Sequence, residues 1–105
     1  MKYYELRIYT LKPGTVNQYK KYFDEIGGPI ITKYLKLVGF WYTEIGSLNQ
    51  LVSIWEYDSL DKRTEQRKAL YQDEEWNTKF IPQVMPFFIA QENRIMLSLD
   101  SSPIK

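Results

Sequence analysis

Charged side chains inside strand-like sequence are the first candidates for chemistry in this chain. Glu5, Arg7 and Tyr9 alternate along an N-terminal segment of high β-propensity, so they share one face of the strand that it predicts. Glu44 lies within another strand-like segment, residues 40–46. A charge within a sheet is costly unless it is paired. Two interpretations follow. The charges form a structural ion pair that fixes the sheet register, or they form the polar end of a pocket in which Glu44 is the acid/base and Arg7 or Tyr9 steers negative charge.

Aromatic side chains form a second set of candidates. Trp41, Trp55 and Tyr57 are expected on one face of a hairpin made by residues 40–46 and 50–57. Such an aromatic wall is typical of a core or a dimer interface, and also of a site for a planar, apolar ligand. In the second case, the predicted ligand-binding residues are Trp41, Tyr42, Ser53, Trp55 and Tyr57.

Two residue types are missing, and their absence excludes several kinds of catalytic and metal site. The chain has no cysteine and no histidine. It therefore has no disulfide, no thiolate nucleophile, no histidine base and none of the usual zinc or histidine-ligated haem sites. We expect no metal and no cofactor. Nothing near Ser53 in the sequence would activate its hydroxyl as a nucleophile.

The charge distribution argues against two classes of partner. The net charge is +1, with 14 basic and 13 acidic residues interspersed. This pattern gives neither the positive field of a nucleic-acid surface nor a basic amphipathic helix for a membrane. We expect Arg63, Arg67 and Lys68 to form a solvated helix face. The apolar stretches are far shorter than the roughly 20 residues of a membrane span, and a cytoplasmic location is expected.

The elements that must position these residues follow the order β-α-β-β-α-β. The expected strands are residues 3–10, 40–46, 50–57 and 87–98. The expected helical regions are 15–39 (with a break or kink at 27–29), 60–71 and 73–84. This order is the ferredoxin-like α+β arrangement with a four-stranded antiparallel sheet. If Gly46 opposes Gln50 in the hairpin, Glu44 opposes Val52.

Both faces of this sheet carry apolar side chains, but the helices can cover only one. The chain has 105 residues, enough for a single domain over residues 1–105, and 16% of them are aromatic. That is more large apolar surface than a small monomer easily buries. Two sheets packed face to face in a homodimer would cover it.

Five segments together resemble the NIPSNAP family of the dimeric α+β barrel superfamily. They are Tyr4–Tyr9, Leu11–Gly14, Val38–Gly46, Leu48–Gln50 and Ile54–Leu60. The resemblance covers most of residues 3–97 and implies a ferredoxin-like protomer that forms a homodimeric α+β barrel. The superfamily includes cofactor-free oxygenases, isomerases and haem enzymes. The family often has histidine where this chain has Ser53, and the haem-binding relatives depend on a histidine, so haem chemistry is not implied.

Two functions remain open. In the first, the homodimer has no assigned activity and binds a small, largely apolar or aromatic ligand between sheet and helices, or a protein partner. In the second, it is a cofactor-independent isomerase, dehydratase or monooxygenase that acts on a planar molecule, with Glu44 as acid/base and Arg7 and Tyr9 holding an oxyanion. The substitution Glu44→Gln separates the two. It should abolish turnover in the second case and alter only stability or binding in the first.

Overall fold

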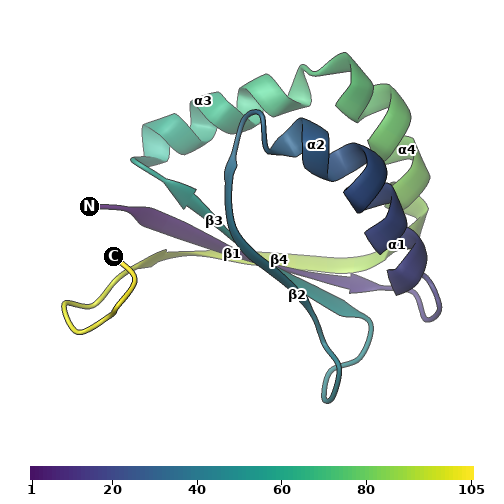
Figure 1. Ribbon diagram of the computed structural model, residues 1–105, viewed down its shortest axis with the longest axis horizontal. Helices are drawn as coiled ribbons and strands as arrows, with labels where there is room; N and C mark the ends of the chain where they lie inside the picture. Colours follow the sequence, from purple (N-terminus) through teal and green to yellow (C-terminus); the bar gives the residue numbers. More distant parts are fainter.

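Four antiparallel strands form one sheet, and all the helices lie over one of its faces (Figure 1). The computed structural model describes residues 1–105. The strands are β1 Tyr3–Leu11, β2 Lys36–Tyr42, β3 Gln50–Tyr57 and β4 Phe88–Leu97, in the spatial order β2-β3-β1-β4. Each β-α-β unit thus crosses over the same face of the sheet. The predicted ferredoxin-like α+β fold is confirmed.

The first helical connection runs without a break through its glycine-rich segment. It consists of α1 Val16–Tyr22, a π-helical turn η1 Phe23–Gly27 and α2 Gly28–Ile31. The chain stays helical through residues 27–29, so an outright break is wrong; the irregularity in this segment is the π-helical turn η1, and Pro29 follows it in the first turn of α2. The predicted end of the helix at Gly39 is also wrong, since Gly39 lies within β2.

The second connection begins as predicted, with a polar helix. It consists of α3 Leu60–Tyr71, a π-helical turn η2 Trp76–Phe80, α4 Ile81–Val84 and a 3₁₀ turn η3 Met85–Phe87. The Ser59 hydroxyl accepts a hydrogen bond from the Lys62 backbone N–H at 3.0 Å, which caps the first turn of α3. None of the helices is long and apolar enough to cross a lipid bilayer.

The register of the β2–β3 hairpin differs from the prediction. Strand β2 ends at Tyr42, which pairs with Leu51, and Trp41 pairs with Val52. Glu44, expected opposite Val52, lies instead in an exposed loop. Since successive side chains point to opposite faces of a sheet, the shift takes Trp41 off the face that it was expected to share with the β3 aromatics.

A longer hairpin loop accounts for the shift. Residues 43–49 connect the two strands. Asn49 has a φ of 63° and Gly46 a φ of 117°, both in the left-handed region that closes such loops. The Asn49 carbonyl also accepts a hydrogen bond from the Leu11 N–H at 2.8 Å, which ties the loop to β1. This contact comes from a distant segment, so the local sequence does not reveal it.

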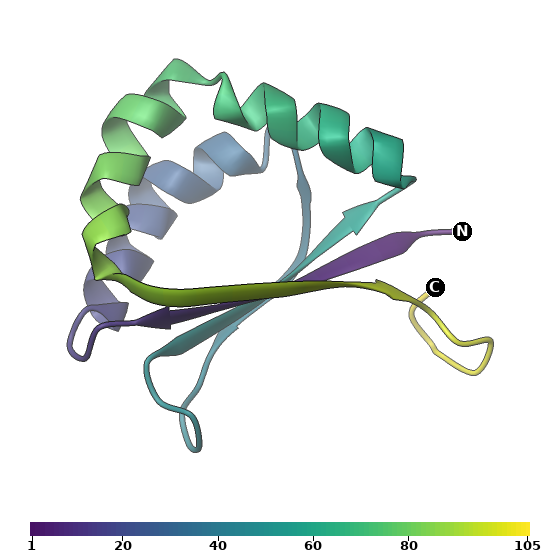
Figure 2. The ribbon, with the colours of Figure 1, turned by 180° about the vertical axis from the view of Figure 1, so that it is seen from behind.

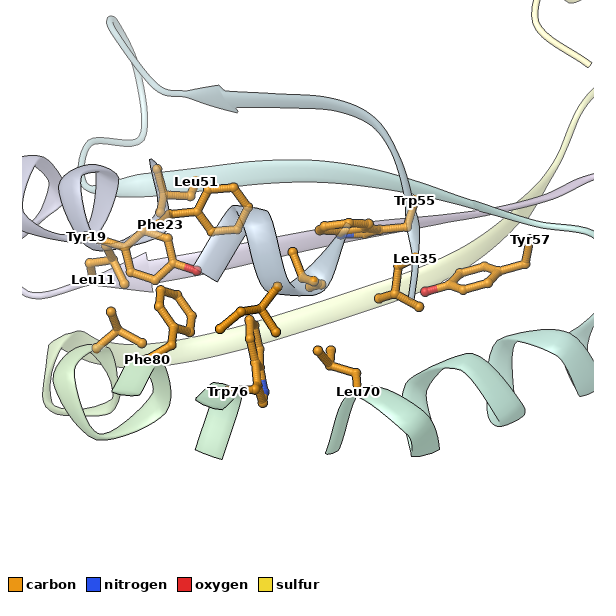
Figure 3. Packing of buried hydrophobic residues seen from close by; sticks show 13 residues of the cluster. Leu11, Tyr19, Phe23, Leu35, Leu51, Trp55, Tyr57, Leu70, Trp76 and Phe80 are labelled. Carbon is orange, nitrogen blue, oxygen red and sulfur yellow. The ribbon is translucent and has the colours of Figure 1, made fainter. Parts of the chain in front are cut away.

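The core lies between the covered face of the sheet and the two helical connections. Figure 3 shows Trp55 extending from the sheet toward the same interior as Trp76 and Phe80 from the helical side. The two π-turns approach closely. A Cβ atom added at Gly27 would lie only 2.4 Å from the Phe80 ring. Glycine at this position therefore sets the distance between the two connections.

The opposite face of the sheet has no helix over it, as the two ribbon views agree (Figures 1 and 2). By strand alternation and register, this face carries Leu6, Ile8, Val52 and Ile54, all partly exposed. Val38 from the edge strand β2 is also exposed. The uncovered face is thus largely apolar at its centre.

Candidate functional site

Strand β1 places two predicted site residues, Arg7 and Tyr9, on the covered face of the sheet together with Glu5. The Arg7 Nη1 donates to the Glu5 Oε2 at 2.9 Å, and the Arg7 Nε donates to the Tyr9 hydroxyl at 2.9 Å. The prediction that Glu5, Arg7 and Tyr9 share one face is confirmed. Glu5 is completely buried, so its carboxylate depends on these and other partners.

Helix α3 supplies two more arginines to the same carboxylate. The Arg63 Nε and Nη2 donate to the two Glu5 oxygens at 3.1 and 2.7 Å, and the Arg67 Nε donates to Oε1 at 3.2 Å. Arg67 is only 7% exposed, so the prediction that both arginines belong to a solvated helix face is wrong. The spacing of Arg63, Arg67 and Leu70 could have indicated this location. Residues three or four apart share one face of a helix, and Leu70 on this face is fully buried.

Two neutral groups complete the shell around Glu5. The Tyr57 hydroxyl donates to Oε1 at 3.2 Å, and the Asn93 Nδ2 donates to Oε2 at 2.7 Å. Burial raises the pKa of Glu5, but the hydrogen bonds from Arg63 and Asn93 and the charges of Arg67 and Arg7 outweigh it and hold the pKa at about 2. The group, called here the Glu5 cluster, comprises Glu5, Arg7, Tyr57, Arg63, Arg67 and Asn93.

A cavity of about 110 Å³ adjoins the Glu5 cluster, between the sheet and the helices. Its wall is mostly aromatic and aliphatic, and Arg67 belongs both to this wall and to the cluster. The lining residues are Tyr9, Tyr19, Phe23, Ile31, Phe40, Ser53, Trp55, Arg67, Tyr71, Trp76, Phe80, Ile81, Val84, Met85, Phe88 and Gln91. An apolar cavity of roughly 150 Å³ in another protein holds benzene, so this space suits a group of about one ring.

Polar groups stand at defined places on the cavity wall. The Trp55 Nε1 donates to the Ser53 Oγ at 2.9 Å, and both residues are buried on β3. The Arg67 Nη1 donates to the Tyr71 hydroxyl at 3.2 Å, one helical turn further along α3. These bonds leave a polar edge on an otherwise apolar wall, the arrangement that orients a ligand in a pocket.

The five predicted ligand-binding residues are divided among three places. Ser53 and Trp55 lie on the cavity wall, and Tyr57 donates its hydroxyl to Glu5. Trp41 and Tyr42 line a neighbouring groove of about 290 Å³ and are not part of the cavity wall, although the groove shares Tyr19, Phe23 and Phe40 with that wall. The hairpin register explains this division, since it moves Trp41 out of step with the β3 aromatics.

Glu44 lies apart from the other two predicted catalytic residues. It is exposed in the hairpin loop, and no hydrogen bond or ion pair joins it to Arg7 or Tyr9, which are instead bonded to each other. The negative charge of Glu44 acts on Tyr42, whose pKa is raised because the nearby carboxylate favours the neutral hydroxyl over the phenolate. The structure therefore brings Arg7 and Tyr9 together with Glu5 rather than with Glu44.

Comparisons with known proteins identify relatives along nearly the whole chain. The sequence model of the NIPSNAP family matches residues 4–103. The human Protein NipSnap homolog 3A is 37% identical over 94 residues, which are 89% of this chain and 38% of the human protein. The chain thus spans well under half the length of this curated relative.

Solved structures agree with this relationship. A NIPSNAP family protein with unknown function from Agrobacterium tumefaciens superposes with a TM-score of 0.95 at 37% identity, covering 99% of this chain and 94% of that chain. A putative antibiotic biosynthesis monooxygenase from Nitrosomonas europaea has a TM-score of 0.68 at 10% identity over 96% of this chain and 93% of that chain, which shows a shared fold alone. The chain belongs to the NIPSNAP family.

Proposed function

We propose that this NIPSNAP chain binds a small, largely apolar or aromatic ligand in the cavity between its sheet and its helices. The composition of the wall carries the proposal, since 13 of its 16 lining residues are hydrophobic. Ser53, Arg67 and Gln91 supply the few polar groups. Small-molecule sites generally have this character, an apolar enclosure with a few placed polar groups.

The helical side of the cavity offers further support. Phe23 and Phe80 both line the cavity, and each comes from a π-helical turn. Their ring centroids are 6.2 Å apart with an edge-to-face angle of 71°, so the two turns meet through these rings. Isolated π-turns within helices occur frequently at functional sites, because they move side chains out of the regular helical pattern.

We propose binding rather than proton-transfer chemistry because Glu5, the carboxylate beside the cavity, is held in its ionised form. Glu5 accepts hydrogen bonds from five side chains, and its pKa is held at about 2. A general acid or base works best when its pKa lies near the operating pH. The ionised Glu5 instead holds the three arginines in place beside the cavity.

Nuclear magnetic resonance with toluene as probe tests the proposal. Trp55 and Trp76 line the cavity, whereas Trp41 lies outside it, so the three indole N–H signals report on two places in one spectrum. Toluene should shift the signals of Trp55 and Trp76 in a saturable way and leave that of Trp41 unchanged. Unchanged Trp55 and Trp76 signals at high toluene concentration would contradict the proposal.

A pair of variants locates the binding. Ile81→Phe adds volume at the cavity wall and should weaken toluene binding at least about tenfold, because the cavity has room for only about one ring. Leu48→Phe makes a comparable change in the exposed hairpin loop and should leave binding unchanged. Equal toluene affinity in the two variants would place the probe elsewhere.

We also propose that the chain forms a homodimer through the uncovered face of the sheet. Leu6, Ile8, Val52 and Ile54 give this face an apolar centre without a helix over it. Opposite this centre on β4, Glu92 pairs with Ile8 and Arg94 with Leu6. A second copy related by a two-fold axis presents the same surface, and apolar contact at the centre with complementary charges at the edge favours such self-association.

Native mass spectrometry tests the dimer. The expected mass is twice the 12.6 kDa of one chain. Ile54→Lys should give monomers, because it puts a charge in the centre of the uncovered face, whereas Ile45→Lys in the exposed hairpin loop should stay dimeric. A monomeric parent protein, or dimers from both variants, would contradict this interface. We expect the dimer in the cytoplasm, and recovery in membrane fractions of the source cells would contradict that location.

A further inference from the structure

A groove of about 550 Å³ on the surface of α3 is lined largely by hydrogen-bond donors and positive charge. Its residues are Arg63, Thr64, Arg67, Lys68, Tyr71 and Gln72. No acidic side chain lines it. Long-range attraction in such a groove favours an anion, and positively charged walls raise its local concentration.

The Glu5 cluster beneath this groove leaves much of the positive charge uncompensated. Three arginines are paired with the single carboxylate of Glu5, so two positive charges remain in excess. Lys68 adds a further charge and forms no ion pair within the chain. Buried and half-buried charges normally have partners, so this excess points to a negatively charged ligand.

Some guanidinium nitrogens remain available for such a ligand. Arg67 donates from Nε and Nη1 within the chain but not from Nη2, and Arg63 donates from Nε and Nη2 but not from Nη1. The one buried side-chain polar atom without a hydrogen bond is the Gln66 Oε1. The free nitrogens of Arg63 and Arg67 are therefore open to solvent rather than sealed in the core.

Arg67 and Tyr71 connect this groove with the ligand cavity. Both residues line both spaces, and the hydrogen bond from the Arg67 Nη1 to the Tyr71 hydroxyl joins them at 3.2 Å. Tyr71 is 53% exposed, so its ring is not held tightly by the core. The cavity and the groove therefore meet at these two side chains.

We infer that the ligand is a small aromatic carboxylate, with its ring in the cavity and its carboxylate on the free N–H groups of Arg67 and Arg63. This inference rests on the proposed ligand cavity. The guanidinium fork matches the two oxygens of a carboxylate, and hydrogen bonds between charged partners are stronger than neutral ones. The cavity has room for about one ring, which selects monocyclic ligands.

Isothermal titration calorimetry with benzoate and benzamide tests the carboxylate. The two probes have the same ring and nearly the same shape, but only benzoate is charged. Benzoate should bind about tenfold or more tightly than benzamide, and added salt should reduce the difference. Equal affinities would overturn the carboxylate inference and leave the ligand cavity intact.

Two charge reversals on α3 locate the anion. Lys68→Glu changes the groove and should weaken benzoate binding several-fold, with little effect on benzamide. Lys62→Glu makes the same change in net charge on the same helix but outside the groove, and should have little effect on either probe. Equal losses of benzoate affinity in both variants would overturn the assignment to the groove.

The cavity variant distinguishes this inference from the proposed function. Ile81→Phe should weaken both benzoate and benzamide binding if the ring enters the cavity. Benzoate binding that is unaffected by Ile81→Phe but reduced by Lys68→Glu would contradict the ligand cavity and leave an anion site in the groove. Failure of both probes to bind at millimolar concentration would overturn the carboxylate inference, and the toluene titration would then decide the ligand cavity on its own.

Discussion

Glu5 on β1 and Arg63 on α3 are joined by two hydrogen bonds, from Nε to Oε1 at 3.1 Å and from Nη2 to Oε2 at 2.7 Å. This fork ties the first strand to a helix 58 residues later in the chain. Arg67 bonds to the same carboxylate and lines the ligand cavity. The pairing therefore fixes how α3 lies over the sheet and where the cavity wall stands.

Replacing this carboxylate should be strongly destabilising. Glu5→Gln leaves Arg7, Arg63 and Arg67 without their charged partner in a buried place, and breaking a buried pair in this way costs about 3–5 kcal/mol. Urea unfolding measures the loss in the free energy of unfolding. Glu65→Gln removes an exposed carboxylate from α3 and should change little. Similar losses for the two variants would argue against the central role of Glu5.

The same carboxylate predicts how stability depends on pH. The pKa of Glu5 is lowered from 4.5 to about 2 on folding, so as the pH falls the unfolded chain takes up the proton first. The contribution is fully present above about pH 5 and is lost progressively toward pH 2. The shift corresponds to about 3 kcal/mol.

Urea unfolding at pH 7 and pH 3 checks this dependence. The Glu5→Gln protein should lose less stability over this interval than the parent protein does. Its remaining loss comes from Glu56, Asp58 and Asp73, whose pKa values are also lowered by their hydrogen-bond partners. Identical losses in the two proteins would contradict the assignment to Glu5.

Adding a side chain at Gly27 should destabilise the fold. A Cβ atom there would lie 2.4 Å from the Phe80 ring, so Gly27→Ala must push the two π-turns apart. Overpacking of this kind costs about 1–3 kcal/mol in the free energy of unfolding. Thermal and urea unfolding measure it, with Asn17→Ala on the exposed side of α1 as a control that should be nearly neutral. Gly27→Ala should also alter toluene binding, because Phe80 lines the cavity.

Glu44→Gln should leave folding and ligand binding unchanged. The residue is exposed in the hairpin loop and contacts neither the Glu5 cluster nor the cavity wall. The free energy of unfolding and the affinity for toluene are the two measurements. A large loss of affinity, or a turnover that this substitution abolishes, would support the enzyme hypothesis drawn from the sequence.

Local sequence signals predict the fold well because they report on local structure. The alternation of Glu5, Arg7 and Tyr9 gives the first strand and the shared face, and both are confirmed. Ser59 marks the beginning of α3 for a physical reason, since its hydroxyl caps the first turn. The order of helices and strands along the chain, β-α-β-β-α-β, then gives the strand order of the ferredoxin-like sheet.

The site is harder to predict because its geometry depends on contacts between distant segments. Arg63 and Arg67 have the local sequence pattern of ordinary surface charges, and their partner Glu5 comes from the distant strand β1. The hairpin register depends on the Asn49 carbonyl, which bonds to Leu11 in another strand. The prediction that Ser53 and Trp55 share one face of β3 is confirmed, because the alternation of this strand is regular; the sequence does not predict which face the helices cover.

A crystal structure of the protein under xenon pressure tests the ligand cavity most directly. Xenon enters apolar cavities of this size and is located by its electron density. We predict a xenon atom between the sheet and the helices, in contact with Trp55, Phe80 and Val84. Xenon found only in the groove beside Trp41 and Tyr42, or bound nowhere in the interior, would contradict the account.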